Sequence, residues 1–179
     1  MKKIIVSTLA ICVATAAHAV DLRQYFGVKV SDVFGNADVK DGGDITMREQ
    51  FGLAAQYGVK LSDFRAELEL AHYLKASPKG EDVDVSHTIL FVNGYYDLAT
   101  NSPFSPYATI GIGYNRILVD GDSDPSLAFK LGLGASWNIN TNIALDLGYR
   151  YIRFGEYNDD HVDVTFSGHE LSLGARFSF

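Results

Sequence analysis

The chain has 179 residues, of which 47% are hydrophobic, 12% aromatic and 21% charged, and its formal net charge is −7. This length is enough for one domain with a single core, and the acidic balance argues against binding to nucleic-acid phosphates. The single cysteine excludes an internal disulfide framework and a cysteine-rich zinc site. A mean hydropathy near zero is typical neither of a disordered chain nor of a helical membrane protein.

The first nineteen residues have the three-part pattern of a secretory signal peptide. Two lysines at 2–3 precede an apolar run at 4–16, and the small residues of Ala-His-Ala at 17–19 follow. The run is short for a transmembrane anchor, and Ile11 is larger than the residue that precedes the cysteine of a lipoprotein signal at Cys12. We therefore expect cleavage after residue 19.

Cleavage would leave residues 20–179 as one domain without cysteine. Because both lysines of the signal are lost, the net charge changes from −7 to −9. No disulfide can then hold the domain, so backbone hydrogen bonds and packing must do so.

This remaining chain alternates between apolar and polar residues in eight segments. Strict alternation predicts strands with one apolar and one polar face. The predicted strands are 22–34, 45–57, 64–74, about 83–98, 107–118, 127–139, 143–151 and 171–179.

Most of these strands are longer than the five or six residues of ordinary strands and match the roughly 9–11 residues that cross a bilayer. Short and long links alternate between them, which places both termini on the short-turn, periplasmic side. A soluble sandwich or lipocalin-like barrel is the competing fold, with its apolar face inward. We predict an all-β fold, an eight-stranded antiparallel up-and-down transmembrane β-barrel in the cell outer membrane. The short links are 58–63, 99–105 and 140–142, and the long ones 35–44, 75–84, 119–126 and 155–167.

The polar faces of the strands would fill the narrow lumen of such a barrel. A structural network of ion pairs is one interpretation, because unpaired charges there would be costly. A narrow or gated ion path is the other. The predicted lumen charges are Arg23, Lys29, Arg65, Glu67, Glu69, Lys130, Asp146, Arg150, Glu170 and Arg176.

Several segments recur in one family of surface proteins. They are YYDL at 95–98, PYA at 106–108, GIGY at 111–114, LGYRY at 147–151 and the alternating end LSLGARFSF at 171–179. Together they resemble the opacity-type outer-membrane proteins, a porin-like family of Gram-negative bacteria. The resemblance implies an eight-stranded barrel, and it implies that Phe177 and Phe179 belong to the signal read by the barrel-assembly machinery. Because binding residues of this family lie in variable loops, none is transferred.

The four long links carry a net charge of −10, so the acidic excess gathers at the outer end. One interpretation of this acidic excess is that it keeps the loops hydrated. The other is that it binds a divalent cation or a basic partner. Asp120, Asp122 and Asp124 alternate as in calcium loops, although the downstream ligand of an EF-hand is missing.

A search for catalytic residues gives Ser167 and His169 beside Glu170, and strand parity directs His169 outward and Glu170 inward, so the two cannot easily cooperate. We therefore expect no enzyme activity and no cofactor. The predicted function is that of a surface antigen or adhesin-like protein acting through four acidic extracellular loops. The alternatives are a structural envelope barrel and a narrow ion channel. The expected partners of a monomer are outer-membrane lipids and lipopolysaccharide, the assembly machinery, and host surface or serum proteins.

Overall fold

The computed structural model describes residues 22–39, 43–46, 50–76, 85–119, 122–159 and 162–179. The predicted signal peptide, residues 1–19, lies outside the described residues. Among the described residues, no helix is long and apolar enough to cross a membrane.

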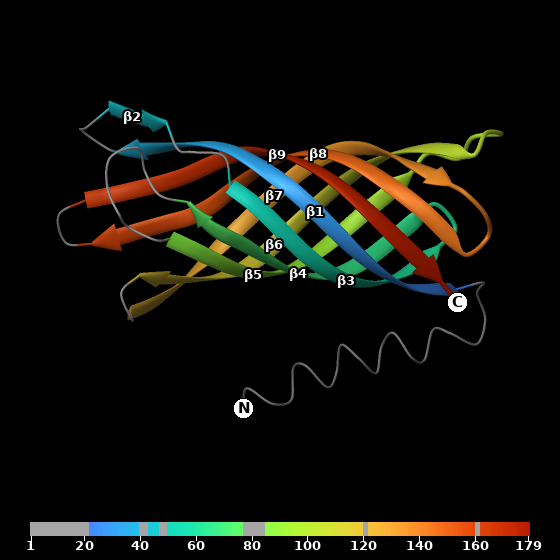
Figure 1. Cartoon of the computed structure of the whole chain (residues 1–179), viewed down its shortest axis with the longest axis horizontal. Coiled ribbons are helices and arrows are strands. Elements are labelled where there is room, and N and C mark those ends of the chain that lie inside the picture. Colours follow the sequence, from blue (N-terminus) through green and yellow to red (C-terminus); the bar gives the residue numbers. More distant parts are fainter. Residues whose placement is uncertain (1–21, 40–42, 47–49, 77–84, 120–121, 160–161) are drawn as a thin grey trace.

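Eight long antiparallel strands form a closed barrel in the described part of the chain (Figure 1). Each strand pairs with its neighbour in sequence, and β1 closes the barrel by pairing with β9 from Tyr25–Ser178 to Val39–Val164. The predicted fold class is thereby confirmed. A short strand, β2 (Gly43–Thr46), adds to the far end of β1. The barrel strands are β1 (Leu22–Val39), β3 (Gln50–Leu61), β4 (Phe64–Ala76), β5 (Val85–Asp97), β6 (Phe104–Val119), β7 (Asp122–Asn138), β8 (Ile143–Asp159) and β9 (Val162–Ser178).

The alternation of side chains is opposite to that of a soluble barrel. In β7, Leu131 and Leu133 are 63% and 67% exposed on the outer wall, whereas Lys130, which directly precedes Leu131, is 2% exposed. An apolar outer wall suits lipid, and closure leaves no unpaired strand edge in a membrane. The polar parity of the strands therefore faces the lumen.

Both described ends of the chain lie at one end of the barrel, as Figure 1 shows. Tight connections join the strands here, including the two-residue turn between Leu61 and Phe64. Aromatic rings pair across neighbouring strands at this end, with Phe64 against Tyr96 at 5.1 Å between centroids and Phe104 against Trp137 at 5.9 Å. We call this the terminal end and the opposite one the outer end.

The strands run further toward the outer end than the alternation predicted. The segments 119–126 and 155–167 were expected to be links, but β6 pairs with β7 as far as Val119–Asp122, and β8 with β9 as far as Asp159–Val162. Likewise β1 extends to Val39. Polar residues continue these hairpins because ladder hydrogen bonds need only the backbone, so hydropathy marks where lipid ends rather than where the strand ends.

Candidate functional site

The lumen is filled by two layers of inward-facing side chains. The one nearer the terminal end, which we call the charge layer, consists of ten buried charged residues, five cationic and five anionic among the residues described. The other, the apolar layer, lies on the same strands toward the outer end. The charge layer is Lys29, Arg65, Glu67, Glu69, Asp97, Lys130, Asp146, Arg150, Glu170 and Arg176. The apolar layer is Val33, Ala71, Tyr73, Ile89, Phe91, Ala128 and Ile152.

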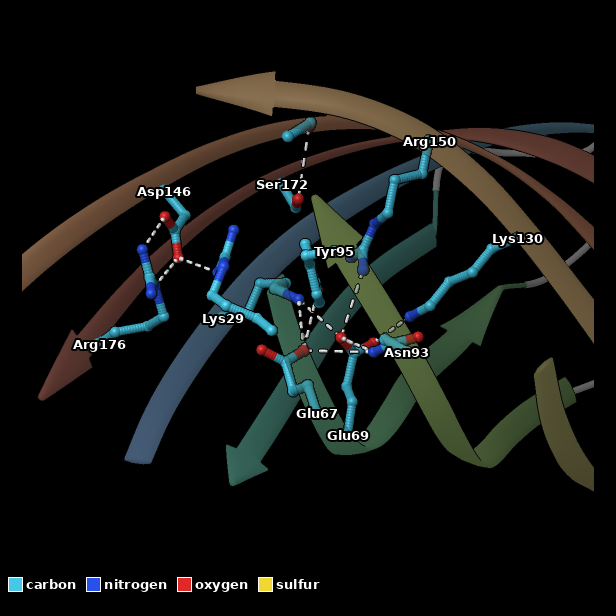
Figure 2. Close-up of polar contacts among 12 residues, drawn as sticks. Lys29, Glu67, Glu69, Asn93, Tyr95, Lys130, Asp146, Arg150, Ser172 and Arg176 are labelled. Carbon is cyan, nitrogen blue, oxygen red and sulfur yellow. Dashed lines mark hydrogen bonds and ion pairs between the residues drawn. The ribbon is translucent and has the colours of Figure 1, made fainter. Parts of the chain in front are cut away.

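Glu69 on β4 is the centre of the charge layer (Figure 2). It accepts hydrogen bonds at 2.6 Å from Lys29 Nζ on β1 and at 2.6 Å from Lys130 Nζ on β7. Arg150 Nη1 on β8 lies 3.3 Å away and donates to the same carboxylate, and Arg150 also pairs with Glu170 on β9. One buried carboxylate thus joins opposite walls of the barrel.

Glu67, two residues earlier on β4, is bound mainly by neutral donors. The hydroxyls of Tyr25 and Tyr95 each donate to it at 2.9 Å, and Asn93 Nδ2 donates at 3.2 Å. Lys29 Nζ lies 3.8 Å from the same carboxylate. A buried carboxylate needs such donors to offset its lost hydration.

A second group of ion pairs lies nearer the terminal end. Asp97 accepts from Arg65 Nε at 2.9 Å and from Lys60 Nζ at 2.7 Å. Asp146 accepts from Arg176 Nη2 at 3.0 Å, and Arg65 Nη1 lies 3.9 Å from its other oxygen. Arg65 therefore connects the two carboxylates.

Tyrosine rings hold Arg65 in place. Its guanidinium carbon lies 4.2 Å from the centre of the Tyr95 ring and 5.0 Å from that of Tyr107. The Tyr107 ring can lie against β7 only because residue 134 is glycine, since a Cβ there would approach the ring to 2.3 Å. Inward glycines thus make room for an aromatic ring, as at Gly134, and for a long charged side chain, as at Gly132 beside Arg150.

The apolar layer closes the lumen on the outer side of the charges. Phe91, Ile89 and Ile152 are fully buried. The two layers meet where Lys130 Nζ lies 3.8 Å from the centre of the Phe91 ring and where the Tyr73 hydroxyl donates to Glu170 at 3.1 Å.

Nine of the ten predicted lumen charges lie in the charge layer, and Arg23 does not. Arg23 is exposed at the terminal end, where its Nη1 donates to the carbonyl of Thr141 at 3.2 Å. The prediction also missed Asp97, which is 3% exposed. The sequence could have indicated this position, because Asp97 alternates with the outward-facing Tyr96 and Leu98. These two changes turn an expected excess of two cations into an equal number of each sign.

The residues proposed for other roles lie outside the lumen. Phe177 and Phe179 face outward, and the Phe179 ring stacks on Phe26 at 5.4 Å. The Phe179 N–H donates to the Gln24 carbonyl at 3.0 Å, which fixes the end of the chain. Recognition of this end by the assembly machinery stays a prediction.

No convergent catalytic or metal-binding group is found in the described ranges. His169 faces outward and contacts the Tyr149 hydroxyl at 2.8 Å, whereas Glu170 is buried in the lumen. No three His, Cys, Asp or Glu side chains of the described residues could share a metal ion. Asp120 lies outside the described residues, and Asp122 and Asp124 begin β7 rather than a link. Calcium binding by these three residues stays a prediction, which titration of an Asp→Asn triple variant would test.

The family model for the outer membrane protein beta-barrel domain matches residues 5–179. The chain belongs to this family. It is therefore an outer-membrane protein, as its lipid-facing wall indicates.

Known relatives of this barrel include surface and outer-membrane proteins. The crystal structure of neisserial surface protein A has a TM-score of 0.68 with it at 26% identity, covering 86% of this chain and 97% of that one. Outer membrane protein PagN of Salmonella typhimurium is 26% identical over 53% of this chain and 51% of its own, so the chain spans about half the length of that relative. A Rickettsia felis protein named as a candidate adhesin is 22% identical over 99% of both chains.

Proposed function

We propose that this protein is a non-enzymatic surface antigen or adhesin-like protein that binds its partners through the outer hairpins of the barrel. The observation that carries this proposal is the filled lumen, because ten buried charges and seven apolar side chains occupy it in the described residues. Because these described side chains fill the middle of the lumen, the barrel would present its binding surface at its ends.

The outer end provides the larger of these surfaces. Strands β6 to β9 have 16–17 residues, whereas a tilted strand needs roughly 9–11 to cross the hydrocarbon core. Since the aromatic pairs mark the membrane boundary at the terminal end, the surplus of about six residues a strand projects from the other side. The acidic residues Asp122 and Asp124 on β7, Glu156 and Asp159 on β8 and Asp163 on β9 belong to these projecting parts, and a basic patch on a host protein would complement them.

The apolar layer argues against the alternative of a narrow ion channel. Ions would have to pass Ile89, Phe91 and Ile152, whose side chains are fully buried, and hydrophobic constrictions stop conduction by losing water. The structural envelope barrel is the stronger competitor, because a network that joins opposite walls supports rigidity directly.

The deciding experiment compares three barrels refolded in lipid vesicles: the native form, a form with all four outer hairpins shortened to tight turns at the membrane boundary, and a control with only the terminal-end link 99–103 shortened. Each is screened against host cells, matrix proteins and serum. We expect binding by the native and control forms and its loss on shortening the outer hairpins. Equal or absent binding in all three would overturn the proposal in favour of the envelope role.

An acidic contact surface has a sharper test. Replacing Glu156, Asp159, Asp160 and Asp163 by their amides removes four negative charges from the segment 156–163 without shortening it. If binding is electrostatic, the association rate should fall and its dependence on salt should weaken. An unchanged rate would show that shape rather than charge is recognised.

A further inference from the structure

A cavity of about 250 Å³ opens at the terminal end of the lumen, opposite the surface proposed above. It is formed by the start of β1, the β3–β4 turn, the β7–β8 turn and the end of β9. The buried side chains of Tyr25 and Arg176 form its inner side, where the charge layer begins. Its lining residues are Arg23, Tyr25, Lys60, Ser62, Asn138, Asn140, Thr141, Asn142, Ile143, Ala144, Arg176 and Ser178.

The charged side chains that line this cavity are all cationic. Arg176 and Lys60 are each paired with a carboxylate that lies behind the lining, Asp146 and Asp97 respectively. Arg23 forms no ion pair with any described residue, and its Nη1 donates a hydrogen bond to the Thr141 carbonyl. A guanidinium has five N–H donors in a planar fork that fits a carboxylate or phosphate, and among the described residues most of these donors have no acceptor.

The wall beside Arg23 is a fixed scaffold. Asn140 Oδ1 accepts the N–H groups of Asn142 and Ile143, both at 2.8 Å, which closes the β7–β8 turn. Asn142 Nδ2 in turn donates to the Ser178 carbonyl at 2.8 Å. Because Arg23 is bound to Thr141 in the middle of this turn, it is held in position before any ligand arrives, which lowers the entropic cost of binding.

We propose that this cavity binds a small soluble oxyanion, a carboxylate or phosphate compound of the periplasm, with Arg23 as its main contact and Lys60 as a second positive charge. The volume equals that of about eight water molecules at ~30 Å³ each, which suits a small molecule rather than a polymer. The charge layer and the apolar layer close the lumen beyond it, so the cavity is a binding site and not the entrance to a path.

A lipid headgroup is the competing source of the same chemistry. A second hollow of about 200 Å³ adjoins Arg23 on the side of Phe179 and Ser178, and an anionic headgroup would bind there, at the edge of the wall. Ser62 lines the first hollow but not the second. Signals from the two sites can therefore be separated.

The test is an NMR titration of the refolded full-length barrel in uncharged detergent micelles with inorganic phosphate and, separately, citrate. We expect saturable shifts of the amide resonances of Ser62 and residues 140–142, reversed by added salt. Arg23→Gln should weaken binding about tenfold, since one charge-assisted contact of ~1.5 kcal/mol is lost. Arg153→Gln, which removes the same charge from the outer half of β8, should bind as the native form does.

Three outcomes would overturn the proposal. The first is the absence of saturable shifts with either anion, and the second is equal binding by Arg23→Gln. The third appears when phosphatidylglycerol is added to the micelles: shifts at Ser178 and Phe179 without any at Ser62, and without competition from phosphate, would assign Arg23 to a lipid headgroup.

Discussion

The two layers of the lumen are surrounded by the same apolar outer wall but are held together in opposite ways. In the charge layer each side chain depends on partners from other strands, as Glu69 depends on Lys29 and Lys130 at 2.6 Å each. In the apolar layer Ile89 and Ile152 depend on filled volume alone. The charge layer therefore fixes which strands face each other, whereas the apolar layer seals the lumen without needing a specific partner.

Removing Glu69 should give the largest effect, because Glu69→Ala leaves three cations of the charge layer short of a partner. Breaking one buried pair costs about 3–5 kcal/mol, so we expect a loss in the upper part of this range or a failure to fold. Urea unfolding in micelles, followed by the gel shift between unboiled and boiled samples, measures it.

Glu69→Gln keeps the shape and loses only the charge, and should fold with a smaller loss. The lipid-facing neighbour Leu70→Ala serves as control. If Leu70→Ala is as costly as Glu69→Ala, the buried charges do not organise the barrel.

Phe91→Ala should come next, since it removes a fully buried ring from the apolar layer. Large-to-small changes in cores cost about 3–5 kcal/mol, of which part is the cavity left behind. Phe129→Ala is the matched control, because Phe129 is 51% exposed on the outer wall and leaves no cavity when lipid fills its place. Equal losses of unfolding free energy would show that the apolar layer is loosely packed.

The comparison of layers also explains what the sequence could and could not predict. Where a strand crosses the charge layer, alternation is strict and both faces can be assigned from parity. In β4, for example, Glu67 and Glu69 alternate with apolar residues. Where β5 crosses the apolar layer, Ile89, Leu90 and Phe91 are apolar on both faces, so the period of two disappears and that segment was the least regular of the eight.

The ion-pair partners of the lumen residues and the ends of the strands depend on contacts between strands, which sequence parity cannot predict. Asp97 could have been found because it alternates with Tyr96, but its pairing with Lys60 and Arg65 depends on the closed barrel. Arg23 was assigned to the charged lumen by parity, although its place at the start of β1 leaves it exposed at the terminal end, outside the charge layer. The apolar layer as a unit was missed, since its members come from separate strands.

Tyr95→Phe should have a moderate effect confined to the charge layer. It removes the hydroxyl that donates to Glu67 at 2.9 Å but keeps the ring over Arg65. A hydrogen bond to a charged group contributes about 1.5–3 kcal/mol, and the other donors to Glu67 should hold the loss near the lower value. The next residue gives the control: Tyr96 is 44% exposed on the outer wall, and Tyr96→Phe should leave urea unfolding almost unchanged. A similar loss of unfolding free energy in both variants would show that the effect does not arise from the charge layer.

Ser62→Gly acts outside both layers and should give the smallest effect of these changes. We expect this effect to be a stabilisation. Ser62 has a φ of 54° in the two-residue turn between β3 and β4, a left-handed conformation that costs a side-chain-bearing residue about 1–2 kcal/mol. Glycine removes this cost but loses more entropy on folding, so the net gain should be below about 1 kcal/mol. At the neighbouring position, which has no positive φ, Asp63→Gly increases the entropy lost on folding without removing any backbone strain. It should therefore destabilise the protein slightly. If both glycine variants shift the unfolding midpoint in the same direction, backbone strain at Ser62 is not what distinguishes this turn.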